Sequence, residues 1–213
     1  AHIVSHNLRS HAANLESMLE MQRATSDPEE KYFFQQNIFK ISASLNNTIQ
    51  HLNEVVQIQT DLKKTKTTIS FQTVFNTVVH ILSANIQKSR AAVHADFSAC
   101  ETVFYNQAYL ESILLNLLSN AIKYRQPNKP SEVFITTSQL ADGQVYLTVK
   151  DNGLGIDLEK HGDRLFGMYE TFHEHPDAKG IGLFITKNQV EAMGGQLLVE
   201  SKLHEGTTFT VRF

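Results

Sequence analysis

The chain has 213 residues, of which 41% are hydrophobic and 19% are charged, enough for one or two globular domains with a sizeable core. Its net charge of −3 and its pI of about 6.4 lack the basic excess that binding to a phosphate backbone requires, so we expect no nucleic-acid partner. A single cysteine, Cys100, excludes an intrachain disulfide framework and fits a reducing compartment, and no apolar run is long enough to span a bilayer.

The first part of the chain, residues 1–64, has the pattern of two consecutive helices. Apolar residues recur at steps of three and four, along one stripe from Val4 to Leu19 and along a second from Ile38 to Val56. Between the stripes, Asp27 is the expected N-cap and is followed by a proline at the first helical position. We therefore predict an antiparallel helical hairpin, and because the chain opens within a helix we expect a fragment of a longer protein.

Two histidines in the first helix differ in their position around the helix axis. At about 100° per residue, the apolar stripe centres about 40° round from Val4. His6 then lies about 160° from this centre and is predicted to face solvent, whereas His11 lies about 60° away, on the flank of the stripe. Two helices alone bury little surface, so the hairpin is expected to pack either on a second copy or on the rest of its own chain.

After about residue 64 the pattern changes to short β-rich runs that alternate with helices. The expected strands are 68–71, 92–98, 102–105, 133–139, 144–151, 195–201 and 207–213, and the expected helices are 72–89, 107–125 and 181–193. The sequence ADG at 141–143 is a hairpin turn signal between two of these strands. We predict a mixed α/β domain that begins near Thr65.

The helix at 107–125, QAYLESILLNLLSNAIKYR, carries polar residues beside its buried stripe. Asn116, Asn120 and Lys123 follow one another at steps of four and three along a neighbouring face. This face is either an ordinary solvated surface or a site in which an amide oxygen binds Mg²⁺ and the lysine lies near phosphates. Spacing alone does not choose between these two interpretations.

The stretch VKDNGLGID places Asp151 at the end of a strand, followed by Gly153 and Gly155. An aspartate in this position is able to accept a hydrogen bond from the exocyclic amine of adenine, and the glycines let the backbone come close to a flat base. Calcium loops and tight turns have similar sequences. A calcium loop would carry further acidic residues where Leu154 and Ile156 stand.

The stretch DAKGIGLFITK places Gly180 and Gly182 immediately before an apolar-periodic helix. A helix N-terminus flanked by glycines presents unpaired N–H groups and the positive end of the helix dipole, which suits a phosphate. The stretch matches neither the P-loop pattern nor the dinucleotide-binding fingerprint.

In this order, the motifs resemble those of the sensor histidine kinases, and the resemblance covers nearly the whole chain. NLLSNAIKY resembles the asparagine box, DNGLGI the first glycine box, KGIGLFITK the second, RLFGMYETFH the phenylalanine segment of the ATP lid, and SHNLRSHAANL the phosphohistidine box. The resemblance implies a hairpin for dimerisation and phosphotransfer at 1–64, a four-helix bundle as a homodimer. It implies at 65–213 an α/β sandwich of the GHKL (Bergerat) type, which is shared with topoisomerase, heat-shock chaperone and mismatch-repair ATPases.

The implied activity is that of a protein-histidine kinase: Mg·ATP binding, autophosphorylation on a histidine, and transfer to an aspartate of a response regulator. The implied ATP-binding residues are Asn116, Asn120, Lys123, Tyr124, Asp151, Gly153, Gly155, Ile156, Phe166, Lys179, Gly180, Gly182 and Leu183. Among them, Asn120 would bind Mg²⁺ and Asp151 would read adenine. Residues 158–179 would form the lid, with Phe166 and Phe172 as apolar anchors. We expect a bacterial, cytoplasmic kinase core, joined to a membrane only through segments outside this chain.

The resemblance aligns His6 with the phosphoacceptor, in agreement with its predicted outward position. Two residues depart from the common family pattern. Asn7 stands where an acid often orients the imidazole and takes its proton, and it is able to orient but not to act as a base. His11 replaces a helix-bending proline, so we predict a straighter helix there. Ser10 stands where many family members carry a residue used in phosphatase activity.

Three alternatives are weighed against this interpretation. His173, His175 and Asp177 have alternate spacing that suggests a metal site, but a polar lid is the better interpretation of three near-adjacent residues. A chaperone or topoisomerase fragment shares the ATPase motifs but not the hairpin with its exposed histidine. A nucleotide-binding dimeric scaffold without phosphotransfer is supported by Asn7 alone.

Overall fold

In a computed structural model of the chain, residues 2–60, 65–168, 170 and 180–213 are described, without the side chains of 2–9, 11, 47, 48 and 50–60. The chain divides into two compact units, which we call the helical unit (Ala1–Thr60) and the α/β unit (Asp61–Phe213). Each unit is described by itself. Among the described helices, none has the length and apolar composition that crossing a bilayer requires.

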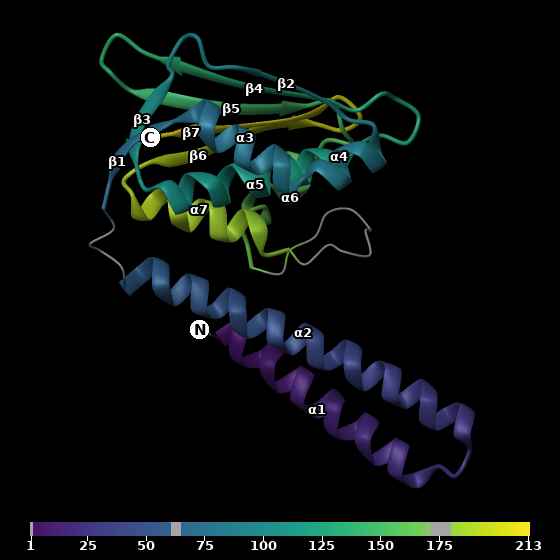
Figure 1. The fold of residues 1–213 in the computed structure, drawn as a ribbon. Helices are drawn as coiled ribbons and strands as arrows, with labels where there is room; N and C mark the ends of the chain where they lie inside the picture. Colours follow the sequence, from purple (N-terminus) through teal and green to yellow (C-terminus); the bar gives the residue numbers. More distant parts are fainter. Residues whose placement is uncertain (1, 61–64, 169, 171–179) are drawn as a thin grey trace. The chain divides into compact units, whose positions relative to one another are not determined.

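The helical unit is a hairpin of α1 (His2–Ala24) and α2 (Pro28–Thr60) (Figure 1). The predicted start of α2 at Pro28 is confirmed, and the side chain of Asp27 accepts a hydrogen bond of 2.9 Å from the backbone N–H of Glu29. Helix α1 continues through residue 11 without a break, because no proline interrupts its hydrogen bonds there.

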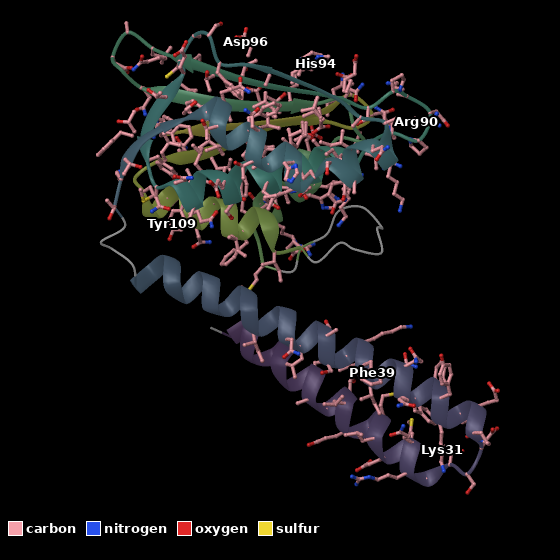
Figure 2. The ribbon with its side chains drawn as sticks, in the orientation of Figure 1. Lys31, Phe39, Arg90, His94, Asp96 and Tyr109 are labelled. Carbon is pink, nitrogen blue, oxygen red and sulfur yellow. The ribbon has the colours of Figure 1, made fainter. Side chains whose placement is uncertain are left out.

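The hairpin leaves large apolar side chains exposed. Tyr32, Phe33 and Phe39 of α2 are each more than half exposed, and Met21 of α1 is 47% exposed. Figure 2 labels Phe39 on α2. Exposed aromatic residues gathered on one small unit are typical of a surface that packs against a partner.

The α/β unit contains a five-stranded sheet with the strand order β2-β4-β5-β7-β6. Its strands are β2 (Ala92–Asp96), β4 (Glu132–Gln139), β5 (Val145–Asp151), β6 (Gln196–Lys202) and β7 (Gly206–Arg212). Only the β2–β4 pair is parallel, and the other three pairs are antiparallel. A separate antiparallel pair joins β1 (Thr67–Ser70) and β3 (Thr102–Tyr105). The predicted α/β class and the hairpin between β4 and β5 are confirmed.

Three helices, α3 (Phe71–Ile81), α5 (Gln107–Lys123) and α7 (Gly182–Ala192), lie together on one face of the five-stranded sheet (Figure 1). Shorter helical segments are α4 (Ser83–Ser89), α6 (Leu158–His161) and the 3-10 turn Gly162–Arg164. The sequence predicted one helix over 72–89, but the chain forms two. Leu82 leaves helical geometry between them, with its side chain buried, and its backbone N–H caps α3 on Val78.

The core lies between the sheet and these helices. Along β4, Val133, Ile135 and Thr137 alternate inward, while eight residues of α5 are buried, among them Leu110 and Leu118. On the opposite face of the sheet, His94 and Asp96 point away from the helices (Figure 2). Helix α5 is therefore fixed in rotation by its buried side, and this determines which of its residues remain at the edge.

Candidate functional site

Helix α5 holds the two asparagines of the predicted site at the margin of the core. Its start is capped by Asn106, whose side chain accepts a hydrogen bond of 3.1 Å from the backbone N–H of Tyr109. Figure 2 shows Tyr109 near this end of the helix. Asn116 and Asn120 lie one turn apart, both half-buried, beside the fully buried residues of the same helix. They are thus held on a packed helix rather than on a loop.

The amide groups of these asparagines form a hydrogen-bonded row that reaches helix α7. Asn116 Nδ2 donates to Thr186 Oγ1 at 2.7 Å, and Asn120 Nδ2 donates to Asn116 Oδ1 at 3.5 Å. Thr186 is almost completely buried. Thr186 stands inside the KGIGLFITK motif, but no role was predicted for it, because a threonine in an apolar-periodic helix gives no signal of its own.

The second glycine motif packs directly against this row. A Cβ placed on Gly182 would lie 2.1 Å from Asn116 Oδ1, so a larger residue would force this amide or α7 to shift. Gly180 has a φ of +65°, a left-handed conformation that also favours glycine. Helix α7 begins at Gly182, and its first turn has no side-chain cap. The fold therefore brings the N-terminus of α7 next to Asn116 of α5, although Asn116 and Gly182 are 66 positions apart in the sequence.

Asp151 ends β5, as predicted, and its carboxylate is tied to two backbone groups. Asp151 Oδ1 accepts hydrogen bonds from the backbone N–H of Gly153 at 2.8 Å and of Thr207 at 3.2 Å. Burial raises the pKa of the Asp151 carboxyl above its ordinary value, and these two hydrogen bonds partly oppose the rise. The carboxylate is half-buried and held in one orientation, as a group that recognises a ligand needs to be.

The first glycine motif is pressed against neighbouring backbone. A Cβ on Gly153 would lie 2.5 Å from the carbonyl oxygen of Tyr124, the residue that ends α5. Gly155 has a φ of +67°, and a Cβ there would lie 1.9 Å from the carbonyl oxygen of Lys202. In this structure both glycines lie against protein backbone. Their close approach holds the loop between the end of α5 and the β6–β7 turn.

Gln126 joins the same three segments and was not predicted. Its Nε2 lies 2.9 Å from each of three carbonyl oxygens, those of Asn152, Gly153 and His204. Nearby, the backbone N–H of Ile156 donates to Ser201 Oγ at 2.8 Å. No motif in the sequence marks Gln126 or Ser201, because both act through backbone groups that only the fold brings near.

Lys123 and Tyr124 lie next to each other at the C-terminal end of α5. Lys123 Nζ is 5.2 Å from the centroid of the Tyr124 ring, within the range of a cation–π contact. Burial raises the pKa of the Tyr124 phenol above its ordinary value. Both side chains are half-buried. The backbone of Tyr124 meets the Gly153 loop, since its carbonyl oxygen accepts a hydrogen bond of 2.8 Å from the N–H of Leu154.

The predicted lid is described only in part. Phe166 is half-buried, and Lys187 Nζ of α7 lies 5.1 Å from the centroid of its ring. Leu165 is almost fully buried and was not predicted as an anchor. Arg164 pairs with Glu170 through two hydrogen bonds of 3.1 and 2.5 Å. Leu183 is half-buried at the start of α7. Phe172, Lys179 and the metal-site alternative at His173, His175 and Asp177 lie outside the described residues.

The candidate phosphoacceptor helix is described in its backbone. His6, Asn7 and His11 are residues of α1, but their side chains lie outside the described part of the structure, so their orientation stays a prediction. Ser10 is described, and it is exposed on α1.

The described residues do not offer a metal site made of protein ligands alone. No group of three histidine, cysteine or acidic residues comes together in the part of the chain that the structure describes. Mg²⁺ often takes one or two protein oxygens together with phosphates and waters. The amide oxygen of Asn120, a half-buried residue one hydrogen bond from Asn116, fits this kind of site, in which phosphates supply most of the negative charge.

Comparisons with known proteins agree on the family. Residues 105–213 match the family described as histidine kinase-, DNA gyrase B- and HSP90-like ATPases. The signal transduction histidine-protein kinase ArlS of Staphylococcus haemolyticus is 28% identical over 187 residues, which cover 81% of this chain and 40% of ArlS. The chain therefore spans less than half the length of that relative.

Two solved structures share the fold across nearly the whole chain. The histidine kinase AdeS of Acinetobacter baumannii has a TM-score of 0.72 at 18% identity, and the match covers 98% of this chain and 96% of AdeS. The histidine kinase ThkA in complex with the response regulator TrrA has a TM-score of 0.71 at 19% identity, over 99% of this chain and 59% of the other. The chain belongs to the histidine kinase-, DNA gyrase B- and HSP90-like ATPase family, and it has the fold of a sensor histidine kinase catalytic core.

Proposed function

We propose that the chain is the core of an ATP-dependent protein-histidine kinase that phosphorylates its own histidine and passes the phosphoryl group to a response regulator. The observation that carries this proposal is the contact between Asn116 of α5 and Gly182 of α7. It supports the proposal because it brings the motif that resembles the asparagine box next to the motif that resembles the second glycine box, in a member of an ATPase family. ArlS, a relative whose match covers 81% of the chain, is named a histidine-protein kinase.

In the proposed nucleotide site, Asp151 accepts a hydrogen bond from the exocyclic amine of adenine. Its carboxylate is already oriented by Gly153 and Thr207, so it loses little freedom when the base binds. The N-terminus of α7 faces the phosphates with its uncapped N–H groups, and Lys123 adds a positive charge near them. When bound at Asn120, Mg²⁺ would neutralise charge on the phosphates.

In the proposed reaction, an imidazole nitrogen of His6 attacks the γ-phosphorus of ATP. A nitrogen–phosphorus bond forms, the bond from phosphorus to the bridging oxygen breaks, and ADP leaves with the electron pair. The imidazole proton passes to water or to a group of the lid, since Asn7 orients the ring but does not act as a base. The phosphoryl group then moves to an aspartate of the regulator, a partner class that the ThkA–TrrA complex also contains.

We propose that the hairpin, residues 1–64, serves dimerisation and phosphotransfer, while residues 65–213 bind ATP. The aromatic residues that α2 exposes support the homodimer, because a four-helix bundle with a second copy would bury them. A bacterial cytoplasmic location also remains a proposal, supported by the bacterial relatives and by the single cysteine.

Incubation with γ-labelled ATP tests the proposal. We expect a phosphoryl group that is labile to acid and stable to base, present in the wild type and in His11→Ala and absent from His6→Ala. Label that persists in His6→Ala and disappears in His11→Ala would show that the acceptor is misassigned.

A second candidate function is a dimeric signalling scaffold that binds nucleotide without transferring phosphate. Asn7 favours it, because the usual acid beside the acceptor is replaced by an amide. Tight ATP binding without any label on the protein, even when a response regulator is present, would support the scaffold over the kinase.

A further inference from the structure

We infer that Thr186 is a positioning residue that sets the orientation of the Mg²⁺-binding amide of Asn120 through Asn116. This inference rests on the proposed function, in which Asn120 is the protein ligand of the metal. Thr186 lies on α7, inside the KGIGLFITK motif but not among the residues that the resemblance assigns to ATP or Mg²⁺. It would act on the metal from two residues away, through the hydrogen-bonded row of amides.

The hydrogen bonds of the row run in one direction, because each amide has a donor at one end, its amino group, and an acceptor at the other, its carbonyl oxygen. Asn116 gives its amino group to Thr186 Oγ1 at 2.7 Å, so its carbonyl oxygen is the end that faces Asn120. Asn120 then gives its own amino group to that oxygen. The carbonyl oxygen of Asn120 is left as the outer end of the row, and an oxygen is what Mg²⁺ requires, because an amino group does not bind a cation.

Burial stabilises the hydrogen bond at the inner end of the row, between Thr186 and Asn116. Thr186 is 1% exposed, so water does not readily replace its hydroxyl as the acceptor for Asn116. The contact between Gly182 and Asn116 Oδ1 keeps α7 close enough for the 2.7 Å hydrogen bond. Of the members of the row, Asn116 and Asn120 are only half-buried and would be free to rotate their amides by half a turn without this anchor.

Replacing Thr186 by valine separates this role from ordinary packing, because valine has nearly the same shape and lacks the hydroxyl. Without the acceptor, each amide has two orientations of similar energy, and Asn120 presents its amino group to the metal for part of the time. Only the nucleotide affinity in the presence of metal is then lowered. A defect in packing would instead weaken nucleotide binding with and without metal.

The experiment measures ADP binding by calorimetry to the wild-type chain and to Thr186→Val, Thr186→Ala and Thr186→Ser, in Mg²⁺ and in chelator. In the wild type, Mg²⁺ strengthens ADP binding. We expect this gain to fall about twofold in Thr186→Val and Thr186→Ala, because about half of the molecules then turn the amino group of Asn120 toward the metal, with binding in chelator unchanged. Thr186→Ser keeps the acceptor and should restore the gain.

The result that overturns the inference is an unchanged Mg²⁺ gain in the valine and alanine variants, or an equal loss in metal and in chelator. Far-UV circular dichroism identifies a variant that does not fold, and the other of the two then carries the test. Asn120→Ala checks the proposed function separately. If it leaves the Mg²⁺ gain unchanged, the metal role of Asn120 fails. If it removes the gain while Thr186→Val does not, only the role of Thr186 fails.

Discussion

The two units of this chain bury their apolar residues in different ways. Every described hydrophobic side chain that is fully buried lies in the α/β unit, between Ile69 and Val211. In the described part of the helical unit, by contrast, no side chain is fully buried, and three aromatic residues of α2 are more than half exposed. The α/β unit thus has a core of its own, whereas the hairpin has the apolar stripes of a bundle without enough partners to cover them.

The two units also carry different parts of the proposed chemistry. The proposed nucleotide site is built on α5 and on β5, which are both anchored in the core of the α/β unit. The predicted phosphoacceptor is on a helix whose stability depends on what covers it. A site that must hold a nucleotide in one geometry benefits from a rigid support, and a helix that is shared between copies suits a role in communication between them.

The largest expected effect comes from a cavity in the α/β core. Leu110 on α5 is completely buried, so Leu110→Ala should lower the free energy of unfolding of this unit by about 2–5 kcal/mol. Urea unfolding of the chain measures the change. Phe39→Ala, at an exposed position of α2, is the matched control and should leave that transition in place. Equal losses in both variants would contradict the contrast between the units.

A second test concerns the contact between the two nucleotide motifs. In Gly182→Ala the added methyl group would overlap Asn116 Oδ1, so α7 or the amide must move. We expect a loss of about 1–3 kcal/mol, expressed mainly as weaker binding of Mg·ADP in calorimetry. Gly143→Ala is the control: it strains the backbone at a φ of +85° in the β4–β5 turn but meets no other atom, so it should lower stability and leave Mg·ADP binding unchanged. Unchanged nucleotide binding in Gly182→Ala would mean that this contact does not position the site.

The third prediction tests whether the hairpin completes its core with a second copy. Replacing Phe39 by serine removes a large apolar side chain from the exposed surface of α2. If that surface is the dimer interface, the dissociation constant measured by sedimentation should rise at least about tenfold, as for an aromatic interface residue. Lys40→Ser, the exposed neighbour on the same helix, provides the comparison. A Phe39→Ser chain that dimerises as tightly as the wild type would remove support for this interface.

The smallest expected effect is a pH dependence from Asp151. Burial raises its folded-state pKa above the ordinary value of 3.8, so the folded chain binds this proton more tightly than the unfolded chain does. Its contribution to stability is therefore fully present below that ordinary value and is lost as the pH rises through the folded-state pKa. Asp151→Asn should raise the melting temperature slightly at pH 7 but not at pH 3, while it weakens ADP binding.

Melting curves at both pH values, with calorimetry on the same samples, give the answer. Glu132→Gln, an exposed acid at the start of the neighbouring strand, is a control that should show neither change. A melting temperature that falls at pH 7 in Asp151→Asn would show that hydrogen bonds to the carboxylate outweigh the cost of its burial.

Most of the secondary structure followed from the sequence. The start of α2 at Pro28, the strands, and the end of β5 at Asp151 depend on spacing and on local residues, and the structure has them in the predicted places. The break at Leu82 was missed, because an apolar residue that turns a helix toward the core has the same spacing as one that continues it. Helix α6 was missed because four residues are too few to show a helical period.

The sequence by itself therefore determined the two units, the order of the motifs and the family that they resemble, since these depend on residue type and spacing along the chain. Only the tertiary structure decided how the motifs meet. No role was predicted for Gln126, or for Thr186 within the second glycine motif, because their partners lie far away along the chain and are reached by hydrogen bonds that folding creates. The structural reason for Gly182 also came only from the tertiary structure, because the atom that a side chain there would meet belongs to Asn116 on another helix.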